Sequence, residues 1–303
     1  MNLERNKITL FLMTFKGYSV LDELIAHEKS CMIHKVVIGE DKNVDKDYSS
    51  EIKELCRTNN ITFENNCGSN KIQTQYAIAV SWKWIIDIRD YKLIVIHDSL
   101  LPKYRGFAPL VNLLKNGEKE TGVTAVFAEI SYDKGEIIHQ LKTDIIYPKK
   151  INDLIKEISV LYNQMILYLF DLIEKNCAIP SVKQNENEAT YSLWLDEDDY
   201  FIDWNKPSED VIRFIDAVGA PYKGASAYLK TKKVRIISAE LIPDLKIENR
   251  CPGKVIFKEE GCPVVVCGKG LLRITGLTDE NQESILPVKG LRLRFRNSRK
   301  DQE

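Results

Sequence analysis

The sequence predicts an α/β protein in two parts: a mostly parallel sheet, followed by a smaller all-β domain. In the first half, continuous apolar runs alternate with segments whose apolar residues recur at helical spacing. That pattern is typical of a parallel sheet covered on both faces. In the last third, short alternating patterns are separated by turns with Gly or Pro, which predicts a small β-barrel or sandwich.

The elements of the first part are expected in a regular order along the chain. Buried strands are predicted at residues 7–13, 34–40, 77–82 and 92–97, and helices at 19–29 and 48–56. An amphipathic helix from Leu110, closed by Gly117, precedes two strands, 124–130 and 136–146, which the turn SYDKG joins. A long helix follows from Ile151 to about residue 175.

A polar segment divides the chain. Residues 182–190 (VKQNENEAT) carry little apolar content, which predicts a linker. We therefore expect one domain over residues 1–188 and a second over 189–303. The second opens with a helix behind Pro207 and continues with strands such as KVRIISAE and LLRITGL.

Composition excludes several classes of protein and site. The formal net charge of −1 gives no general attraction to nucleic acid or anionic membrane. Seven cysteines without a CxxC pair, and only four histidines, argue against a disulfide framework and a metal site and favour a reducing cytoplasm. The apolar run Ile8–Met13 is too short for a membrane span or signal peptide. The turn after the first strand, TFKGYS, lacks the GxGxxG fingerprint.

A titratable pair is predicted at the edge of the sheet. His97 follows the core strand 92–97, and Asp133 lies in the SYDKG turn. Ligands of open α/β sheets bind beyond the carboxyl ends of the strands, so both residues are candidates for proton transfer. On residue types alone, a satisfied surface histidine and a turn aspartate explain them better.

The order of several motifs changes that balance. VIHDSLLPKYRG, then GVT, then DKG is similar to the pattern NxHxSLLPxxRG, GVT, DxG of the N10-formyltetrahydrofolate-dependent formyltransferases. This family includes methionyl-tRNA formyltransferase, glycinamide ribonucleotide formyltransferase and the sugar N-formyltransferases. Residues 201–229 also resemble the start of the C-terminal domain shared by the methionyl-tRNA and sugar enzymes. The resemblance implies a Rossmann-like catalytic domain followed by an OB-like β-barrel.

The resemblance also implies a reaction and a cofactor. A formyl group would pass from N10-formyltetrahydrofolate, as co-substrate, to an amine, without a metal. His97 would take the amine proton or stabilise the oxyanion, and Asp133 would orient His97 and raise its basicity, or accept a proton through water. The loop that follows His97 would wall the folate pocket with four residues: Ser99, Leu100, Leu101 and Pro102.

Further binding residues are expected around this loop. Ser81, Trp82 and Trp84 fall where the family's pterin pocket lies, and the two tryptophans either flank a flat ring or belong to the core. Four residues are candidates for binding the amine substrate: Lys16, Tyr104, Arg105 and Tyr222. Lys16 is placed near a helix N-terminus, where a phosphate can bind, although a solvated lysine explains it better. Arg105 either binds a substrate phosphate or locks its loop by a salt bridge.

One position departs from the family pattern. Val95 stands where the family usually has the Asn that holds the formyl oxygen as it becomes an oxyanion. One such donor contributes ~3 kcal/mol, and valine cannot donate. The hydrolase domain of 10-formyltetrahydrofolate dehydrogenase resembles this chain in having an aliphatic residue there, so Val95 is compatible with activity.

The identity of the amine is a choice among four hypotheses. We expect a sugar N-formyltransferase that acts on an amino sugar, nucleotide-linked, because the second domain shows no basic excess of the kind that a tRNA-binding protein carries. The segments YRGFAPL and DWN also look closer to the sugar enzymes. The alternatives are methionyl-tRNA formyltransferase, a degenerate folate-binding member and a formyl-tetrahydrofolate hydrolase. The resemblance also suggests a homodimer formed through the second domain.

Overall fold

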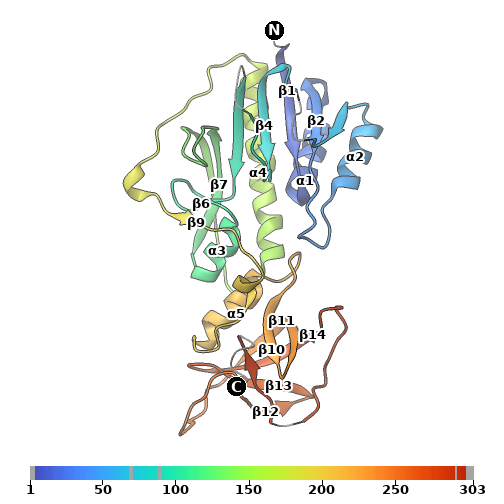
Figure 1. Cartoon of the computed structure of the whole chain (residues 1–303). Helices are drawn as coiled ribbons and strands as arrows, with labels where there is room; N and C mark the ends of the chain where they lie inside the picture. Colours follow the sequence, from blue (N-terminus) through green and yellow to red (C-terminus); the bar gives the residue numbers. More distant parts are fainter. Residues whose placement is uncertain (1–3, 68–70, 88–90, 291, 298–303) are drawn as a thin grey trace. The chain divides into compact units, whose positions relative to one another are not determined.

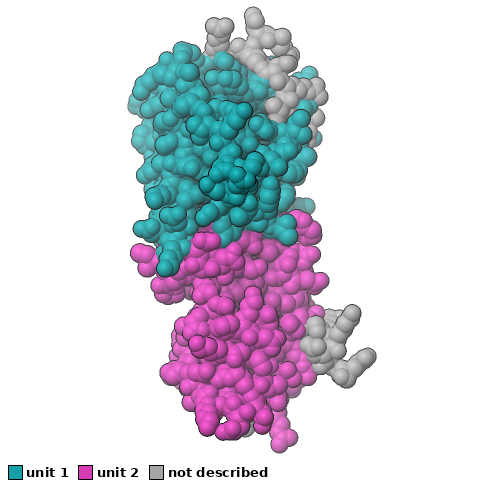
Figure 2. All heavy atoms as spheres, turned by 90° about the vertical axis from the view of Figure 1, so that its left-hand side faces the viewer, with its two compact units in different colours: residues 1–109, 119–145, 154–193 teal, residues 110–118, 146–153, 194–303 magenta. Residues whose placement is uncertain are grey.

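The computed structural model describes residues 4–67, 71–87, 91–290 and 292–297, and it separates into two compact units. Unit 1 comprises residues 1–109, 119–145 and 154–193, and unit 2 comprises residues 110–118, 146–153 and 194–303 (Figure 2). Most of the second unit is therefore the C-terminal third of the chain, to which two short segments of the first half are added.

The core of unit 1 is a seven-stranded sheet in the order β3-β2-β1-β4-β5-β7-β8 (Figure 1). Its strands are β1 (Glu4–Leu12), β2 (Ile33–Ile38), β3 (Phe63–Asn65), β4 (Thr74–Val80), β5 (Lys92–His97), β7 (Glu120–Phe127) and β8 (Ile137–Asp144). The strands from β3 to β5 are parallel to one another. β7 runs antiparallel to β5, and β8 antiparallel to β7. The predicted Rossmann-like, mostly parallel sheet is confirmed.

The two faces of this sheet are covered differently. The helices α1 (Thr14–Ala26), α2 (Ser49–Thr58) and α4 (Ile151–Glu174) pack beside one another, α1 against α2 and, through the Ser19–Asn163 hydrogen bond, α1 against α4. On the other face, an apolar cluster is covered by loop residues such as Ile72, Trp82 and Ile86. The cluster consists of Phe11, Val37, Ala77, Ala79 and Leu93. Both faces are covered, as predicted, but loops replace helices on the face that His97 shares.

The loop after β5 is fastened to β7 and β8. Thr124 Oγ1 donates to Ser99 O at 2.6 Å and accepts from Leu101 N at 3.1 Å. Gln140 Nε2 donates to Thr124 Oγ1 at 2.9 Å and to Leu101 O at 2.8 Å. A Cβ at Gly122 would lie 2.7 Å from Leu100 Cδ2, so glycine lets this loop approach β7 closely. One buried threonine thus determines the path of the Ser99–Pro102 loop.

The predicted linker is a strap around unit 1. We call residues 177–193, which run from the end of α4 to β9 (Tyr191–Ser192), the strap; Figure 1 shows its last part in yellow. Val182 forms a backbone bridge with Ile137 at the start of β8, and β9 pairs in parallel with β6 (Arg105–Gly106). A short 3-10 helix, Glu186–Glu188, lies between these two attachments. The segment is polar because it lies on the surface, although its backbone is paired at both ends.

Unit 2 contains α5 (Ser208–Ala217) and a six-stranded antiparallel sheet in the order β12-β13-β14-β11-β10-β15. The strands are β10 (Ala225–Leu229), β11 (Lys232–Ile242), β12 (Val255–Glu259), β13 (Cys262–Val266), β14 (Leu271–Thr278) and β15 (Phe295–Arg296). Register shifts between Ile236 and Ala239 bend β11 against β14, and the sheet curls into a half-barrel. The predicted small barrel-type domain is confirmed. The α3 helix (Pro109–Asn116) lies largely in this unit.

Among the described residues, no helix is long and apolar enough to cross a membrane. No group of three or more His, Cys, Asp or Glu side chains in the described ranges is arranged to hold a metal ion.

A half-buried carboxyl group couples unit 2 to pH. Burial raises the pKa of Asp216, on α5, from its ordinary 3.8 to about 6, against the opposing positive charge of Lys150. A raised carboxyl pKa means that the folded state binds the proton more tightly than the unfolded chain does. The free energy of unfolding therefore falls as pH rises from about 4 to about 6.

We expect Thr124→Val to lower the free energy of unfolding by about 3 kcal/mol, because Ser99 O and Leu101 N lose their buried partner. Urea unfolding measures the change. Thr121→Val is the matched control on the same strand: Thr121 is also buried, but its hydroxyl has no hydrogen-bond partner among the described residues. Equal losses in the two variants would contradict the assigned role of the Thr124 hydroxyl.

We expect Asp216→Asn to stabilise the protein above pH 7 by about 1 kcal/mol, a figure reduced to allow for partial solvent screening. At pH 3.5 wild type and variant should unfold at the same urea concentration. Parallel urea titrations at both pH values test this, with the exposed Asp22→Asn as control. A difference that does not change with pH would show that Asp216 titrates normally.

Candidate active site

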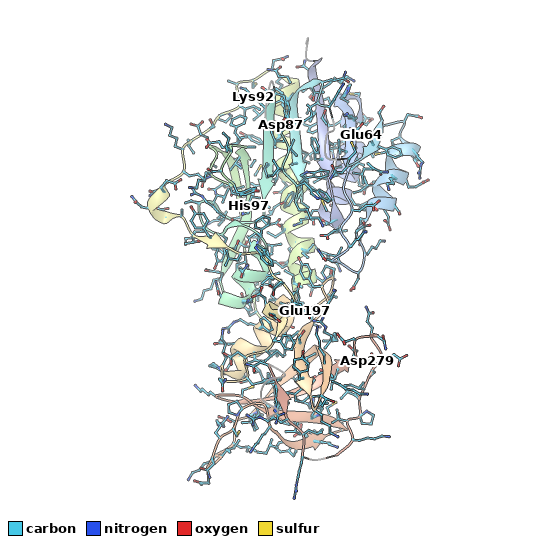
Figure 3. The ribbon with its side chains drawn as sticks, in the orientation of Figure 1. Glu64, Asp87, Lys92, His97, Glu197 and Asp279 are labelled. Carbon is cyan, nitrogen blue, oxygen red and sulfur yellow. The ribbon has the colours of Figure 1, made fainter. Side chains whose placement is uncertain are left out.

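The carboxyl end of β5 places two titratable side chains on opposite faces of the sheet. His97 is 8% exposed, and its Nε2 lies 2.8 Å from Tyr104 O (Figure 3). Its Nδ1 faces Asp133 Oδ1 at 3.6 Å. Asp98, the next residue, contacts side chains of α1 and α4 instead. The structure thus brings His97 and Asp133 together, as the motif order predicts.

Asp133 reaches His97 by a route that the strand-end argument does not predict. β7 is antiparallel and ends with Phe127 beside Ile94, near the amino end of β5. The loop after β7 must therefore return towards the carboxyl end of β5. Gln184 Nε2 holds it by donating to Asp133 O and Gly135 O, each at 2.7 Å. A residue of the strap thus positions the catalytic candidate.

The Asp133 carboxylate is also held from β6. Gly106 N donates to Asp133 Oδ2 at 2.8 Å. Gly106 has a φ of 100°, and a Cβ there would lie 2.6 Å from Ser192 O of the strap. Only glycine fits this backbone conformation and this close approach. The glycine of the RG motif therefore helps to hold the carboxylate that faces His97.

Lys16 is paired within the protein. Its Nζ contacts Asp98 Oδ2 at 2.5 Å, and the hydroxyl of Tyr162 contacts Asp98 Oδ1 at 2.7 Å and Ile96 O at 2.8 Å. Burial, followed by the negative charge of Asp98, raises the pKa of Tyr162 well above its ordinary value. Tyr162 thus remains a neutral donor that ties α4 to the end of β5. Neither the solvated lysine nor a free phosphate site describes Lys16 in this structure.

Arg105 is completely buried. Its guanidinium donates to Gln184 Oε1 at 2.7 Å, to Glu186 Oε1 at 2.7 Å and to the Tyr191 hydroxyl at 3.3 Å. The bond to Glu186 raises the pKa of Arg105 and lowers that of Glu186. Of the two roles expected for Arg105, these contacts match the lock on its loop. Tyr104 contributes its carbonyl oxygen to His97, and its N–H donates to Thr190 Oγ1 at 2.9 Å.

The segment after β4 offers unpaired donors. Ser81 has a φ of 54°, and among the described residues neither its hydroxyl nor the indole N–H of Trp82 has a hydrogen-bond partner, although both atoms are buried. The Trp82 ring packs against Phe11 and Trp84 with centroids 5.0 Å apart in both pairs, and Trp84 is 39% exposed. Two buried donors beside an exposed ring suit a flat, polar heterocycle such as a pterin.

The remaining candidates are the residues of the Ser99–Pro102 loop and Tyr222. Leu101 is buried, Leu100 and Pro102 are half-buried, and Ser99 Oγ donates to Lys103 O at 2.6 Å, which shapes the loop. Tyr222 belongs to unit 2, where its N–H donates to Gly219 O at 3.0 Å.

Sequence reasoning missed the strap residues that hold the site: Gln184, Glu186 and Thr190. Their segment carries only the polar composition of a linker, and no local pattern marks a contact with residues far back in the chain. The one available signal was Arg105 itself, because a buried arginine requires partners.

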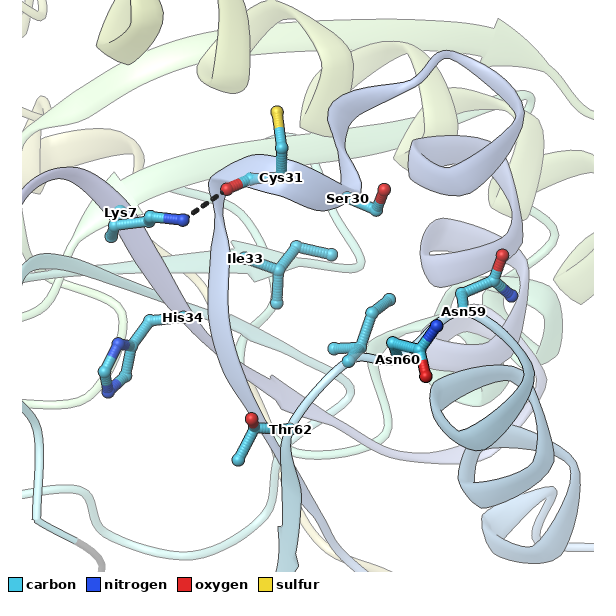
Figure 4. A pocket seen from close by; sticks show the side chains of 9 residues that line it. Lys7, Ser30, Cys31, Ile33, His34, Asn59, Asn60 and Thr62 are labelled. Atoms are coloured by element: carbon cyan, nitrogen blue, oxygen red, sulfur yellow. Dashed lines mark hydrogen bonds between the residues drawn. The ribbon is translucent and has the colours of Figure 1, made fainter.

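A hollow of about 260 Å³ lies elsewhere, near the amino ends of β2 and β3 (Figure 4). Its walls include Lys7, His34, Asn60 and Thr62, and Lys7 Nζ donates to Cys31 O at 2.5 Å. Because His97 lies at the carboxyl end of the sheet, this hollow is separate from the titratable pair.

Two family models match the chain. Residues 67–167 match the formyl transferase model, and residues 195–289 match the formyl transferase C-terminal domain model. The first match contains His97 and Asp133, and the second covers most of the half-barrel unit.

Two curated relatives have the same name. A methionyl-tRNA formyltransferase of Thermodesulfovibrio yellowstonii is 32% identical over 217 residues, which are 70% of this chain and 68% of that protein. The enzyme of the same name from Natranaerobius thermophilus is 29% identical over 66% of this chain and 64% of its own length. The alignments thus span about two thirds of these relatives.

Solved structures share the fold. A sugar 3N-formyl transferase, WlaRD, solved with dTDP and 5-N-formyl-THF, has a TM-score of 0.65 at 20% identity and covers 93% of this chain and 99% of its own. HypX from Aquifex aeolicus, in complex with tetrahydrofolic acid, has a TM-score of 0.64 at 19% identity, covering 92% of this chain and 45% of its own. With both family models matched and a paired His97 and Asp133 inside the first, the chain belongs to the formyl transferase family.

Proposed function

We propose that this protein transfers a formyl group from N10-formyltetrahydrofolate to the amino group of a nucleotide-linked amino sugar. The observation that carries the chemistry is the His97–Asp133 pair, 3.6 Å apart at the carboxyl end of β5 within the family match. Such a pair supplies proton transfer and charge stabilisation for attack of an amine on a formyl carbon.

In this mechanism His97 works through Nε2 and is oriented through Nδ1. Asp133 faces Nδ1, and its second carboxylate oxygen is fixed by Gly106 N at 2.8 Å. The amine approaches Nε2 and replaces Tyr104 O as its partner, and His97 reacts in the tautomer that carries its proton on Nδ1, towards Asp133, so that Nε2 can accept. His97 accepts the amine proton as the N–C bond forms, and the tetrahedral oxyanion then collapses as the bond from carbon to folate N10 breaks. The proton passes to the departing N10.

Two loops, one after β4 and one after β5, form the proposed folate pocket. Ser81 Oγ and Trp82 Nε1 are the donors that meet the heterocycle, and Trp84 offers its exposed ring. The loop from Ser99 to Pro102, fastened by Thr124, forms the opposite wall. Val95, on β5, packs on the apolar cluster beneath this segment. Its side chain therefore contributes apolar contacts at a position where another residue could have offered a hydrogen-bond donor to the substrate.

The charge of the C-terminal region and the extent of the fold match support an amino sugar as the acceptor. Residues 194–303 contain 19 Lys and Arg against 18 Asp and Glu, which is no electrostatic footprint for tRNA. The fold matches WlaRD over nearly the whole of both chains.

Methionyl-tRNA is the second candidate acceptor. The curated relatives named methionyl-tRNA formyltransferase favour it, at 32% and 29% identity. Sequence identity thus supports one acceptor and charge distribution the other, so the assay must include both.

The deciding experiment measures tetrahydrofolate release from N10-formyltetrahydrofolate with a panel of nucleotide-linked 3-amino and 4-amino sugars, methionyl-tRNA, and water alone. Release that depends on one amino sugar establishes the proposal. Release with methionyl-tRNA alone overturns it in favour of the second candidate. Release in water alone identifies a hydrolase, and binding of folate without release identifies a degenerate member.

We expect His97→Asn and Asp133→Asn each to lower kcat by about 10²- to 10⁴-fold, because proton transfer and its orientation are lost. Steady-state kinetics give the rates, and circular dichroism verifies the fold. Val160→Ala, an exposed position on α4, is the control and should keep the wild-type rate. A normal kcat in either active-site variant would eliminate the mechanism.

We expect Val95→Asn to keep or raise kcat while lowering the melting temperature. The amide adds a hydrogen-bond donor beside the reacting carbon, but it replaces apolar packing on the Phe11–Leu93 cluster. Kinetics and thermal unfolding of the same preparation separate the two effects. A large loss of kcat without a change in melting temperature would show that the valine itself is needed for the chemistry.

A further inference from the structure

Two exposed aromatic side chains stand beside the catalytic pair. Phe107 is 43% exposed and Tyr132 is 60% exposed, and their ring centroids lie 6.0 Å apart with the planes inclined at 58°. Ile130, on the same loop as Tyr132, is fully exposed. Single exposed apolar residues are common on protein surfaces, but a contiguous group of large ones marks a binding site.

The same contacts that hold Asp133 also hold this pair. Phe107 follows Gly106, whose N–H donates to the Asp133 carboxylate, and Tyr132 directly precedes Asp133. Phe107 N in turn donates to Ser192 O of the strap at 3.1 Å. Both rings are therefore attached to the two segments that meet at the carboxylate. Both rings keep a large exposed area, 43% for Phe107 and 60% for Tyr132, which is open to a ligand.

We propose that Phe107 and Tyr132 form the subsite for the pyranose ring that carries the reacting amine, an inference that rests on the proposed function. An amine that takes the place of Tyr104 O at His97 Nε2 brings the ring to which it is bonded beside the segment from Tyr104 to Phe107. The C–H groups on one side of a pyranose are apolar and pack on aromatic rings, and the Tyr132 hydroxyl supplies a polar partner for a sugar hydroxyl. This pair therefore selects the sugar.

The test compares Michaelis constants for the two substrates. With the amino sugar nucleotide that wild type formylates, Phe107→Ala and Tyr132→Ala should each raise the KM of the acceptor about tenfold or more. The KM for N10-formyltetrahydrofolate should stay at the wild-type value. Tyr132→Phe retains the ring and should raise the acceptor KM less than Tyr132→Ala does. Val160→Ala is the control for an exposed apolar truncation away from the site.

The outcomes separate this inference from the proposed function. If wild type formylates an amino sugar nucleotide and both alanine variants keep its KM, the inference is overturned and the proposed function stands. An equal rise in both Michaelis constants would also overturn it, since the pair would then act on the folate loops. If wild type formylates none of the amino sugars, or methionyl-tRNA alone, the proposed function fails and the sugar subsite fails with it.

Discussion

A buried guanidinium is the constraint on which the rest of the site depends. Arg105 is removed completely from solvent, and an unpaired charge in that position would be strongly destabilising. Its partners, Gln184 and Glu186, come from the strap, so the strap must fold over β6. Once there, Gln184 donates from its other end to the carbonyls of Asp133 and Gly135. The charge of one arginine thus positions the carboxylate that orients His97.

The two residues at the end of β5 make their contacts on opposite faces of the sheet. On the loop-covered face, His97 meets Asp133 and Tyr104 O. On the helix-covered face, Asp98 binds Lys16 of α1 and Tyr162 of α4. Because successive strand residues point to opposite faces, one dipeptide both presents the catalytic candidate and anchors the strand end to the helices.

Several features could be predicted from residues near one another in sequence. The strand at 92–97 and the helix from Ile151 were predicted almost to the residue, because apolar periodicity is a local property. α1 begins at Thr14, earlier than the predicted Ser19, since its first turn consists of residues that resemble a loop. Residues 182–190 were predicted as a linker, but their pairing with Arg105 and β8 was not predicted, because it joins residues that lie far apart in the chain.

The sequence by itself determined the fold class, the two-part organisation, the family and the choice of His97 and Asp133 as catalytic candidates, because periodicity and ordered motifs are properties of the chain itself. Only the tertiary structure decided how these residues are used. It shows Arg105 as a lock, Lys16 as the partner of Asp98, and the strap as the support of Asp133. It also exposes Phe107 and Tyr132 beside the carboxylate. The physical reason is that burial and charge pairing depend on which distant segments meet, and composition does not record that.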